Sequence, residues 1–256
     1  MLEKFKRDLL YNYEKFVNLQ SKVNFRVINK ESGYEEDIEK DGGDIVMDFT
    51  QFNDGFTSFS VISELMEFAR GFSSAFSDDF YSLKAFEHLF EYIENYIKKY
   101  PRWLYREEEA LEKYMVYYGL GDKQEIAHSK LQKTTIKLTA DSHYKNITDE
   151  YKELYSDNIY FGTLIGDEIV SITGANGMQN EIVDIGVDTN INHRNKGYAV
   201  SNIVALSDYL LSNNRMVKFS CNNLNTFSIK SAISSGFKLI AKEKTIWCPR
   251  NELLNN

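Results

Sequence analysis

The 256-residue sequence is poor in cysteine and histidine, with two of the first and four of the second. Two cysteines, Cys221 and Cys248, are too few for a disulfide framework or a zinc site, which favours an intracellular protein. The histidines are scattered without the spacing of metal ligands. We therefore expect no metal.

Long apolar runs are also missing. No run approaches the roughly 18 residues that a membrane span needs. The charged N-terminal stretch MLEKFKRDLLYNYEKF has no apolar signal core. These absences predict a soluble, cytoplasmic protein without a membrane partner.

An excess of positive charge is absent too, because the formal net charge is −8. Binding to a nucleic-acid backbone needs a clustered basic surface, so nucleic acid is not expected as a partner. One small basic pocket for an anionic cofactor remains compatible with this charge. Hydrophobic residues make up 43% of the chain, which is ordinary globular usage. We interpret the abundance of Asn, Ile, Lys and Tyr as the mark of an AT-rich bacterial genome.

Hydrophobic periodicity divides the chain into two parts. Apolar residues from Phe80 to Ile97 recur at three- and four-residue steps and predict a helix that ends before Pro101. The stretches 59–72 and 106–121 have the same period, whereas 44–50 is typical of a strand. We predict a mainly helical N-terminal region over residues 1–128.

The sequence of the second part predicts strands followed by strands and helices in alternation. Short β-branched or aromatic runs bounded by Gly, Asp and Asn predict strands at 133–140, 158–166, 167–177, 181–189, 216–221 and 237–247. Helices are predicted at 197–214 and 225–236, and residues 165–168 predict a hairpin between the two strands on either side. This order makes residues 129–256 an α/β or α+β domain.

A polar and basic turn precedes the first of these helices. Its residues 194–199, RNKGYA, have the form Arg-x-x-Gly-x-Ala. The first amides of a helix lack intrahelical partners, and the helix dipole adds partial positive charge there. Gly197 lets the backbone approach an anion, and Arg194 and Lys196 add charge. The turn is suited to a diphosphate, with a plain solvated turn as the alternative.

Together with a second motif, this turn resembles the GCN5-related N-acetyltransferase (GNAT) family over roughly residues 133–247. IGVDTNINHRNKGYA is similar to the family's strand, loop and helix that bind the coenzyme A pyrophosphate. NTFSIKSAISSGF, residues 225–237, is similar to the family's Asn-x-x-Ala segment ending in Gly-Phe. The resemblance implies an α+β (α/β) fold with a mixed, mostly antiparallel acetyltransferase-type sheet and flanking helices in residues 129–256.

The resemblance also implies acetyl-CoA as the cofactor and assigns roles by position. In the family, the strand before the loop splays from its neighbour. The Val187 amide would then face the acetyl carbonyl, and Thr189 would pair with pantetheine. The amides of 194–199 would hold the pyrophosphate. The implied cofactor-binding residues are Val187, Thr189, Arg194, Asn195, Lys196, Gly197, Tyr198, Ala199, Asn225 and Ser228.

The catalytic groups follow the family pattern less closely. Ala232 occupies the position of the tyrosine that many members use as the thiolate acid. Some members of the family carry a glutamate on the strand before the loop and use it as the general base. Counting back from Arg194, this position falls on Val183. Glu181 lies on the same strand face and would act through an ordered water, while Asp184 is closer but on the opposite face. Both carboxylates stay candidate bases.

The resemblance implies direct transfer of an acetyl group from acetyl-CoA to an amine on a small molecule or peptide. A non-catalytic acetyl-CoA-binding or sensing module is the alternative, because Ala232 leaves the acid unassigned. The N-terminal region is expected to supply either one wall of the acceptor site or a homodimer surface. The sequence does not identify the acceptor.

Overall fold

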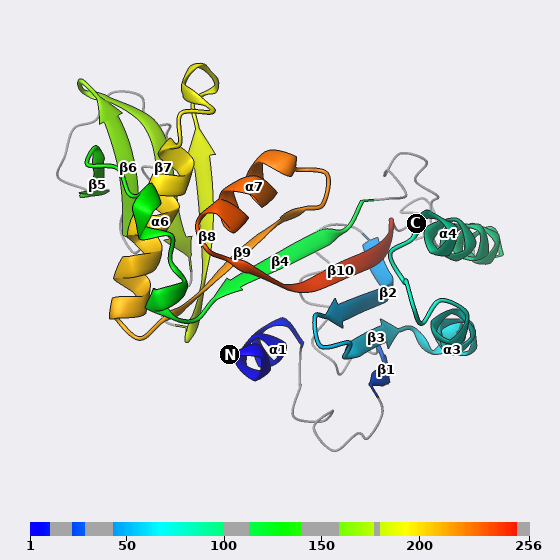
Figure 1. Cartoon of the computed structure of the whole chain (residues 1–256). Helices are drawn as coiled ribbons and strands as arrows, with labels where there is room; N and C mark the ends of the chain where they lie inside the picture. Colours follow the sequence, from blue (N-terminus) through cyan, green and yellow to red (C-terminus); the bar gives the residue numbers. More distant parts are fainter. Residues whose placement is uncertain (11–21, 29–42, 100–112, 140–158, 177–179, 250–256) are drawn as a thin grey trace. The chain divides into compact units, whose positions relative to one another are not determined.

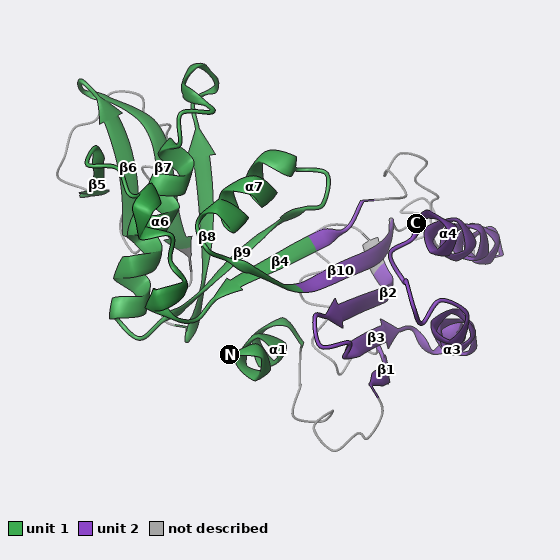
Figure 2. Cartoon of the chain, in the orientation of Figure 1, with its two compact units in different colours: residues 1–11, 116–240 green, residues 12–115, 241–256 purple. Residues whose placement is uncertain are grey.

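The computed structural model describes residues 1–10, 22–28, 43–99, 113–139, 159–176 and 180–249. The chain divides into two compact units (Figure 2). Unit 1 comprises residues 1–11 and 116–240, and unit 2 comprises residues 12–115 and 241–256. Each unit is built from two separated segments, so the units do not follow the predicted division at residues 128 and 129.

Unit 1 is an α/β layer structure (Figure 1). Its helices are α1 (Leu2–Leu9), α6 (Tyr198–Ser212) and α7 (Thr226–Ser234), and its 3-10 turns are η5 (Lys123–Glu125), η6 (His128–Lys130) and η7 (Ile191–His193). Its strands are β4 (Met115–Leu120), β5 (Thr135–Leu138), β6 (Ile159–Ile165), β7 (Glu168–Asn176), β8 (Ile182–Thr189) and β9 (Met216–Asn222). They lie in the order β4-β9-β8-β7-β6-β5.

Strand pairing in unit 1 is mixed and mostly antiparallel. Neighbours from β5 to β8 are antiparallel, and β8 and β9 are parallel. Strands β6 and β7 form the hairpin expected near residue 166, where Gly166 has a φ of +63°. The predicted fold class is therefore confirmed.

Helix α6 covers one face of this sheet (Figure 1) and is fastened to it by buried polar groups. The Asn202 Oδ1 atom accepts hydrogen bonds from the hydroxyls of Thr135, at 3.0 Å, and Thr163, at 2.9 Å. Ser201 is also buried, and its Oγ accepts a hydrogen bond from the Gln132 backbone N–H at 2.7 Å. These bonds fix the start of α6, and with it the preceding loop, against β5 and β6.

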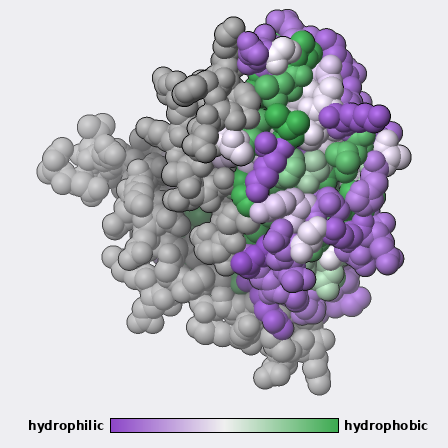
Figure 3. Space-filling model, turned by 90° about the vertical axis from the view of Figure 1, so that its left-hand side faces the viewer, coloured by the Kyte–Doolittle hydropathy of each residue, from purple (hydrophilic) through white to green (hydrophobic). Residues whose placement is uncertain are grey.

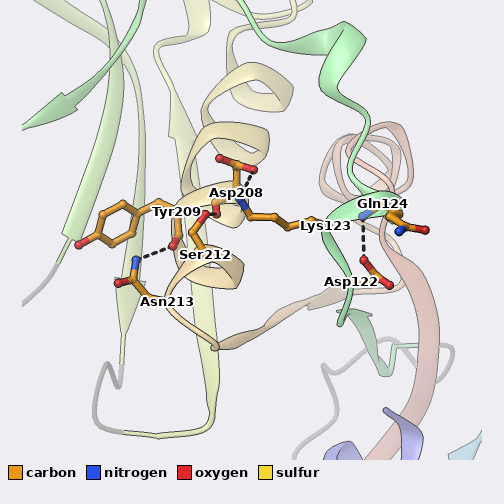
Figure 4. A network of polar contacts seen from close by, with 7 residues as sticks. All are labelled: Asp122, Lys123, Gln124, Asp208, Tyr209, Ser212 and Asn213. Carbon is orange, nitrogen blue, oxygen red and sulfur yellow. Dashed lines mark hydrogen bonds and ion pairs between the residues drawn. The ribbon is translucent and has the colours of Figure 1, made fainter.

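The other end of α6 carries a separate polar network (Figure 4). Lys123 of η5 forms an ion pair with Asp208 at 3.1 Å. The Ser212 hydroxyl and the Asn213 side chain donate to the carbonyls of Asp208 and Tyr209, at 2.6 and 2.8 Å. The bond from Asn213 gives a partner to the Tyr209 carbonyl, one of the last four carbonyls of α6, which a helix end would otherwise leave without partners.

The surface on the side of β5 and β6 is mainly hydrophilic among the described residues, with hydrophobic residues between (Figure 3). Such a mixture is ordinary, because much of any protein surface is apolar. Within the described part of the chain, no helix is long and apolar enough to span a membrane.

Unit 2 packs two helices on a four-stranded sheet. Its strands are β1 (Val23–Val27), β2 (Gly43–Phe52), β3 (Thr57–Val61) and most of β10 (Lys238–Pro249), in the order β1-β3-β2-β10. Strands β1 and β3 are parallel, and the other pairs are antiparallel. Its helices are α3 (Met66–Ala75) and α4 (Leu83–Ile97), and the 3-10 turn η4 (Ser63–Leu65) leads into α3.

Aromatic side chains fill the core of unit 2. Phe49 and Phe59 stack with ring centroids 5.4 Å apart, and Phe72 and Phe80 pack against them. The predicted helix over the stripe from Phe80 to Ile97 is confirmed as α4, which begins after the Ser82 cap. Such rings bury large apolar areas, and this core holds the two helices on the sheet.

Two N-terminal expectations need correction. The helix predicted over residues 106–121 is wrong for its described part, because Met115–Leu120 is strand β4, and residues 106–112 lie outside the described residues. The helical stretch predicted at 59–72 begins as strand β3 and becomes helical only at η4 and α3. In both places aromatic and β-branched residues pair across strands, and tertiary pairing overrides a helical period.

Candidate functional site

Strands β8 and β9 part from each other in the middle of unit 1. Their parallel pairing comprises only Ile182 with Met216, Val183 with Val217 and Asp184 with Lys218. Strand β8 continues to Thr189, still paired with β7, while β9 diverges from it (Figure 1). The edge of β8 from residue 185 onward therefore faces a fork instead of a neighbouring strand.

Backbone alternation shows which residue faces the fork. The carbonyls of Gly186 and Asp188 accept hydrogen bonds from side chains of β7, at 2.6 and 3.2 Å. The Asn190 N–H donates to the β7 residue Val170 at 2.9 Å. Since successive residues of a strand direct their backbone groups to opposite sides, Val187 directs its N–H and C=O into the fork.

A tightly folded loop follows β8. Asn190 caps η7 through a hydrogen bond from the Asn192 N–H to its side chain at 3.0 Å. The Arg194 Nε donates to the Thr189 carbonyl at 3.1 Å, so the guanidinium folds back on the end of β8. Asn195 has a φ of +61° and Gly197 a φ of +84°, both in the left-handed region. These two conformations turn the chain into α6.

Gly197 is the N-cap of α6 and has no side chain with which to cap the helix. The first amides of a helix have no intrahelical partners, so those of residues 198–200 are available to an anion. A Cβ at Gly197 would lie 2.9 Å from the Gln132 Nε2, which donates to the Lys196 carbonyl at 3.1 Å. The loop is thus held in position from the side of η6.

Helix α7 lies beside this loop. Asn225 is its N-cap, and its Oδ1 accepts a hydrogen bond from the Ser228 N–H at 3.1 Å. Ala232 is fully buried. The second motif therefore supplies the start of a helix, and its alanine faces the protein interior.

The loop, the end of β8 and the outer face of α7 enclose a pocket of about 380 Å³. All ten residues predicted to bind the cofactor line it. The sequence reasoning missed the pocket side of α7, where Phe227, Lys230, Ser231 and Ser234 lie at helical spacing on one face. This helical spacing could have predicted, from the sequence, that these four residues share one face of the helix. With Lys230, three cationic side chains surround the pocket, the others being Arg194 and Lys196.

The two candidate bases do not line the pocket. Glu181 forms an ion pair with Lys4 of α1, and this hydrogen bond lowers the pKa of its carboxyl group. Asp184 lies at the base of the fork, 3.1 Å from the Lys218 Nζ, which also contacts Asp8. Burial raises the pKa of Asp184 although Lys218 opposes this shift. Within the described residues, no group of three His, Cys, Asp or Glu is arranged to hold a metal ion.

No protein-family model matches the sequence, and no curated protein matches it either. Solved structures of GNAT acetyltransferases are similar to about half of this chain. A GNAT acetyltransferase from Colwellia psychrerythraea is 12% identical, with a TM-score of 0.42 over 54% of this chain and 55% of its own. One from Novosphingobium aromaticivorans is 13% identical, with a TM-score of 0.42 over 54% of this chain and 65% of its own.

A GCN5-related N-acetyltransferase-like protein from Streptococcus suis is 15% identical, with a TM-score of 0.38 over 52% of this chain and 62% of its own. This chain therefore spans between 55% and 65% of the length of these three proteins.

Proposed function

We propose that unit 1 binds acetyl-CoA in the pocket between the loop of residues 190–199 and α7, and transfers the acetyl group to an amine. The observation that carries this proposal is the fork between β8 and β9, which opens next to a cationic pocket. One end of the site is suited to a diphosphate, and the other offers free strand backbone. A thioester joined to a diphosphate by a long arm has the matching chemistry.

At the end of the pocket that would hold the diphosphate, the amides of residues 198–200 point out of the start of α6. The helix dipole favours negative charge there. Arg194, Lys196 and Lys230 add positive charge around the same pocket. Asn225 and Ser228 line the wall beside it and would contact the pantetheine arm. These groups bind and orient the cofactor, and they take no part in bond breaking.

At the reactive end, the Val187 N–H would donate to the thioester carbonyl and stabilise the negative charge that develops on its oxygen. Thr189, further along the same edge, would pair with the pantetheine amide. The acceptor nitrogen forms the C–N bond, the C–S bond breaks, and the amine loses a proton. The leaving thiolate takes up a proton from a group that the site does not identify.

Of the two candidate bases, Asp184 has the stronger support. It lies three residues before Val187 at the base of the fork, and its raised pKa makes its carboxylate a better base than that of an ordinary aspartate. Glu181 lies further from the fork, and Lys4 lowers its pKa. Glu181 would have to act through water.

A second candidate function is acetyl-CoA binding without catalysis. Its support is the buried Ala232 in the position where many GNAT members carry the thiolate acid. Titration calorimetry with coenzyme A and a thiol-release assay over an amine panel distinguish the two functions. Binding with release of thiol supports the transferase, binding without release over the whole panel supports the sensing module, and the absence of binding contradicts both.

A further inference from the structure

A second pocket lies beside α6 in unit 1. It has a volume of about 460 Å³, which falls within the roughly 300–1,000 Å³ of small-molecule sites. Its lining residues come from η6, β5, β6 and α6, and from the segment between η6 and β5. None of them lines the proposed cofactor pocket, so this is a separate site in the same unit. The residues that decide its chemistry are Leu131, Gln132, Lys133, Phe161, Asp208 and Tyr209.

One wall of this second pocket is apolar and aromatic. Phe161 of β6 and Tyr209 of α6 lie with their ring centroids 5.9 Å apart and their planes tilted by 54°. Leu131 also lines the pocket, and 51% of it is exposed. In Figure 4 the Tyr209 ring points away from the ion pair between Asp208 and Lys123. Aromatic rings pack well against further rings in tilted or offset arrangements, so this wall is suited to a planar aromatic group.

Two lysines beside the aromatic wall have no acidic partner. Lys133 lines the pocket, and Lys137 of β5 has its Nζ 4.3 Å from the centroid of the Tyr209 ring. In the described part of the chain, neither lysine forms an ion pair. The one carboxylate among the lining residues, Asp208, is paired with Lys123 at 3.1 Å. The two lysines therefore favour an anionic group next to the aromatic wall.

Gln132 connects the second pocket to the loop of residues 190–199. It lines the pocket, and its Nε2 donates a hydrogen bond to the Lys196 carbonyl at 3.1 Å. Its backbone N–H donates to the Ser201 Oγ, in the first turn of α6, at 2.7 Å. One residue thus contacts the pocket and holds the chain on both sides of Gly197. A molecule that packs against Gln132 in the pocket also affects the loop.

We propose that the second pocket binds an aromatic carboxylate, and that its occupancy strengthens cofactor binding at the loop. The ring packs against Phe161 and Tyr209, and the carboxylate pairs with Lys133 and Lys137. The bound molecule restricts the half-buried Gln132 side chain to the orientation that bonds to the Lys196 carbonyl. Less conformational entropy is then lost when the loop binds a diphosphate. The coupling rests on the proposed function, whereas the binding of the carboxylate does not.

Indole-3-acetate is a suitable probe, and indole-3-acetamide is its counterpart without the negative charge. A ligand-observed NMR titration of the full chain, without coenzyme A, measures both affinities. We expect the acetate form to bind, and the amide to bind at least about fivefold more weakly, because it cannot form charge-assisted bonds to the lysines. Equal affinities of the two probes would contradict the assignment of a carboxylate.

Two variants locate the site. Lys133→Met keeps an unbranched apolar side chain without the charge, and it is expected to weaken indole-3-acetate binding about fivefold or more while indole-3-acetamide binds as before. Phe161→Leu removes one ring from the aromatic wall and is expected to weaken both probes about threefold or more. Lys84→Met removes a charge from the exposed surface of α4 in unit 2 and is the matched control, with unchanged affinities expected.

The coupling is measured by calorimetry of coenzyme A with and without saturating indole-3-acetate. We expect an increase in coenzyme A affinity of about fivefold or more, and an equal effect of coenzyme A on the probe, because coupling between two sites is reciprocal. Gln132→Ala is expected to abolish this increase while it still binds both ligands. An unchanged increase in that variant would contradict the role of Gln132, since a residue that only stabilises the fold would not alter the ratio of the two affinities.

Failure of the wild-type chain to bind indole-3-acetate, or equal affinity in wild type and a folded Lys133→Met variant, would overturn the proposed site. Identical coenzyme A affinity with and without the probe would overturn the coupling. The two proposals fail in different ways. A chain that binds coenzyme A but no indole-3-acetate retains the cofactor pocket alone, and a chain that binds indole-3-acetate but no coenzyme A retains the second pocket and loses the proposed function.

Discussion

At the scale of single residues, the candidate site depends on backbone conformations that few side chains tolerate. Gly197 has a φ of +84°, and a Cβ there would lie 2.9 Å from Gln132. Left-handed backbone costs an ordinary residue roughly 1–2 kcal/mol. A glycine at this position both permits the turn and leaves the first amides of α6 open to an anion.

Gly197→Asp is expected to lower coenzyme A affinity at least about a hundredfold, because it places bulk and negative charge beside the pyrophosphate. Titration calorimetry measures the loss. Gly166→Asp is the matched control, since Gly166 has a φ of +63° in the β6–β7 turn with open space around its Cβ position. Equal affinities in the two variants would contradict the placement of the pyrophosphate.

Asp184→Asn is expected to lower kcat by about 10²–10⁴, the usual contribution of a general base, and Glu181→Gln by much less. Burial raises the pKa of Asp184, and only the carboxylate form accepts a proton. Activity should therefore fall, as the pH is lowered, at a higher pH than the ordinary aspartate pKa of about 3.9 implies. Steady-state rates across pH test this, and a larger effect of Glu181→Gln would reverse the assignment.

At the scale of elements, the fork between β8 and β9 needs support where the two strands part. Lys218 of β9 pairs with Asp184 of β8 and Asp8 of α1, and only 12% of its side chain is exposed. One ammonium between two carboxylates ties three elements together at the base of the fork. Its removal would leave two partly buried negative charges side by side.

Lys218→Met is expected to lower the free energy of unfolding by about 1–3 kcal/mol, less than for a fully buried pair because Asp184 is half exposed. Urea denaturation measures the change. The double variant Lys218→Met/Asp8→Asn should recover part of the loss, because it removes one of the two unpaired carboxylates. If the double variant instead loses the sum of the two single-variant losses in unfolding free energy, Lys218 and Asp8 do not stabilise each other and the prediction is wrong.

At the scale of the whole molecule, the chain passes between its two units more than once, and each unit has its own sheet region and helices. The residues that line the proposed cofactor pocket all belong to unit 1. Residues of unit 2 can therefore serve as an internal reference for cofactor binding.

Coenzyme A is expected to slow amide exchange in residues 185–200 and 225–234, because bound backbone amides open less often. Hydrogen–deuterium exchange with mass spectrometry, with and without the ligand, measures the effect. The β2–β3 hairpin at 43–61 is the internal reference and should be unchanged. Protection confined to that hairpin would move the cofactor site to unit 2.

Much of unit 1 could be predicted from the sequence, because its strands, helices and glycine turn depend on residues that are close together in the chain. The loop at Arg194 to Ala199 and the strands around it have patterns in neighbouring residues, and the structure shows those strands and that helix. Strand β4 was mistaken for a helix, because a short and nearly continuous apolar run fits a helical period as well as it fits a strand. Phe227 and Lys230 were overlooked although their helical spacing places both on the pocket side of α7.

The sequence by itself determined the features that depend on near neighbours: the periodicity of α4 and α6, the hairpin at Gly166 and the glycine turn at Gly197. Only the tertiary structure decided where β8 leaves β9, that Lys4 engages Glu181, and that Asp48 and Glu243 share one face of a sheet. These features arise from strand register and packing between residues far apart in the chain. No local pattern encodes such pairing, because it depends on which distant segments come together on folding.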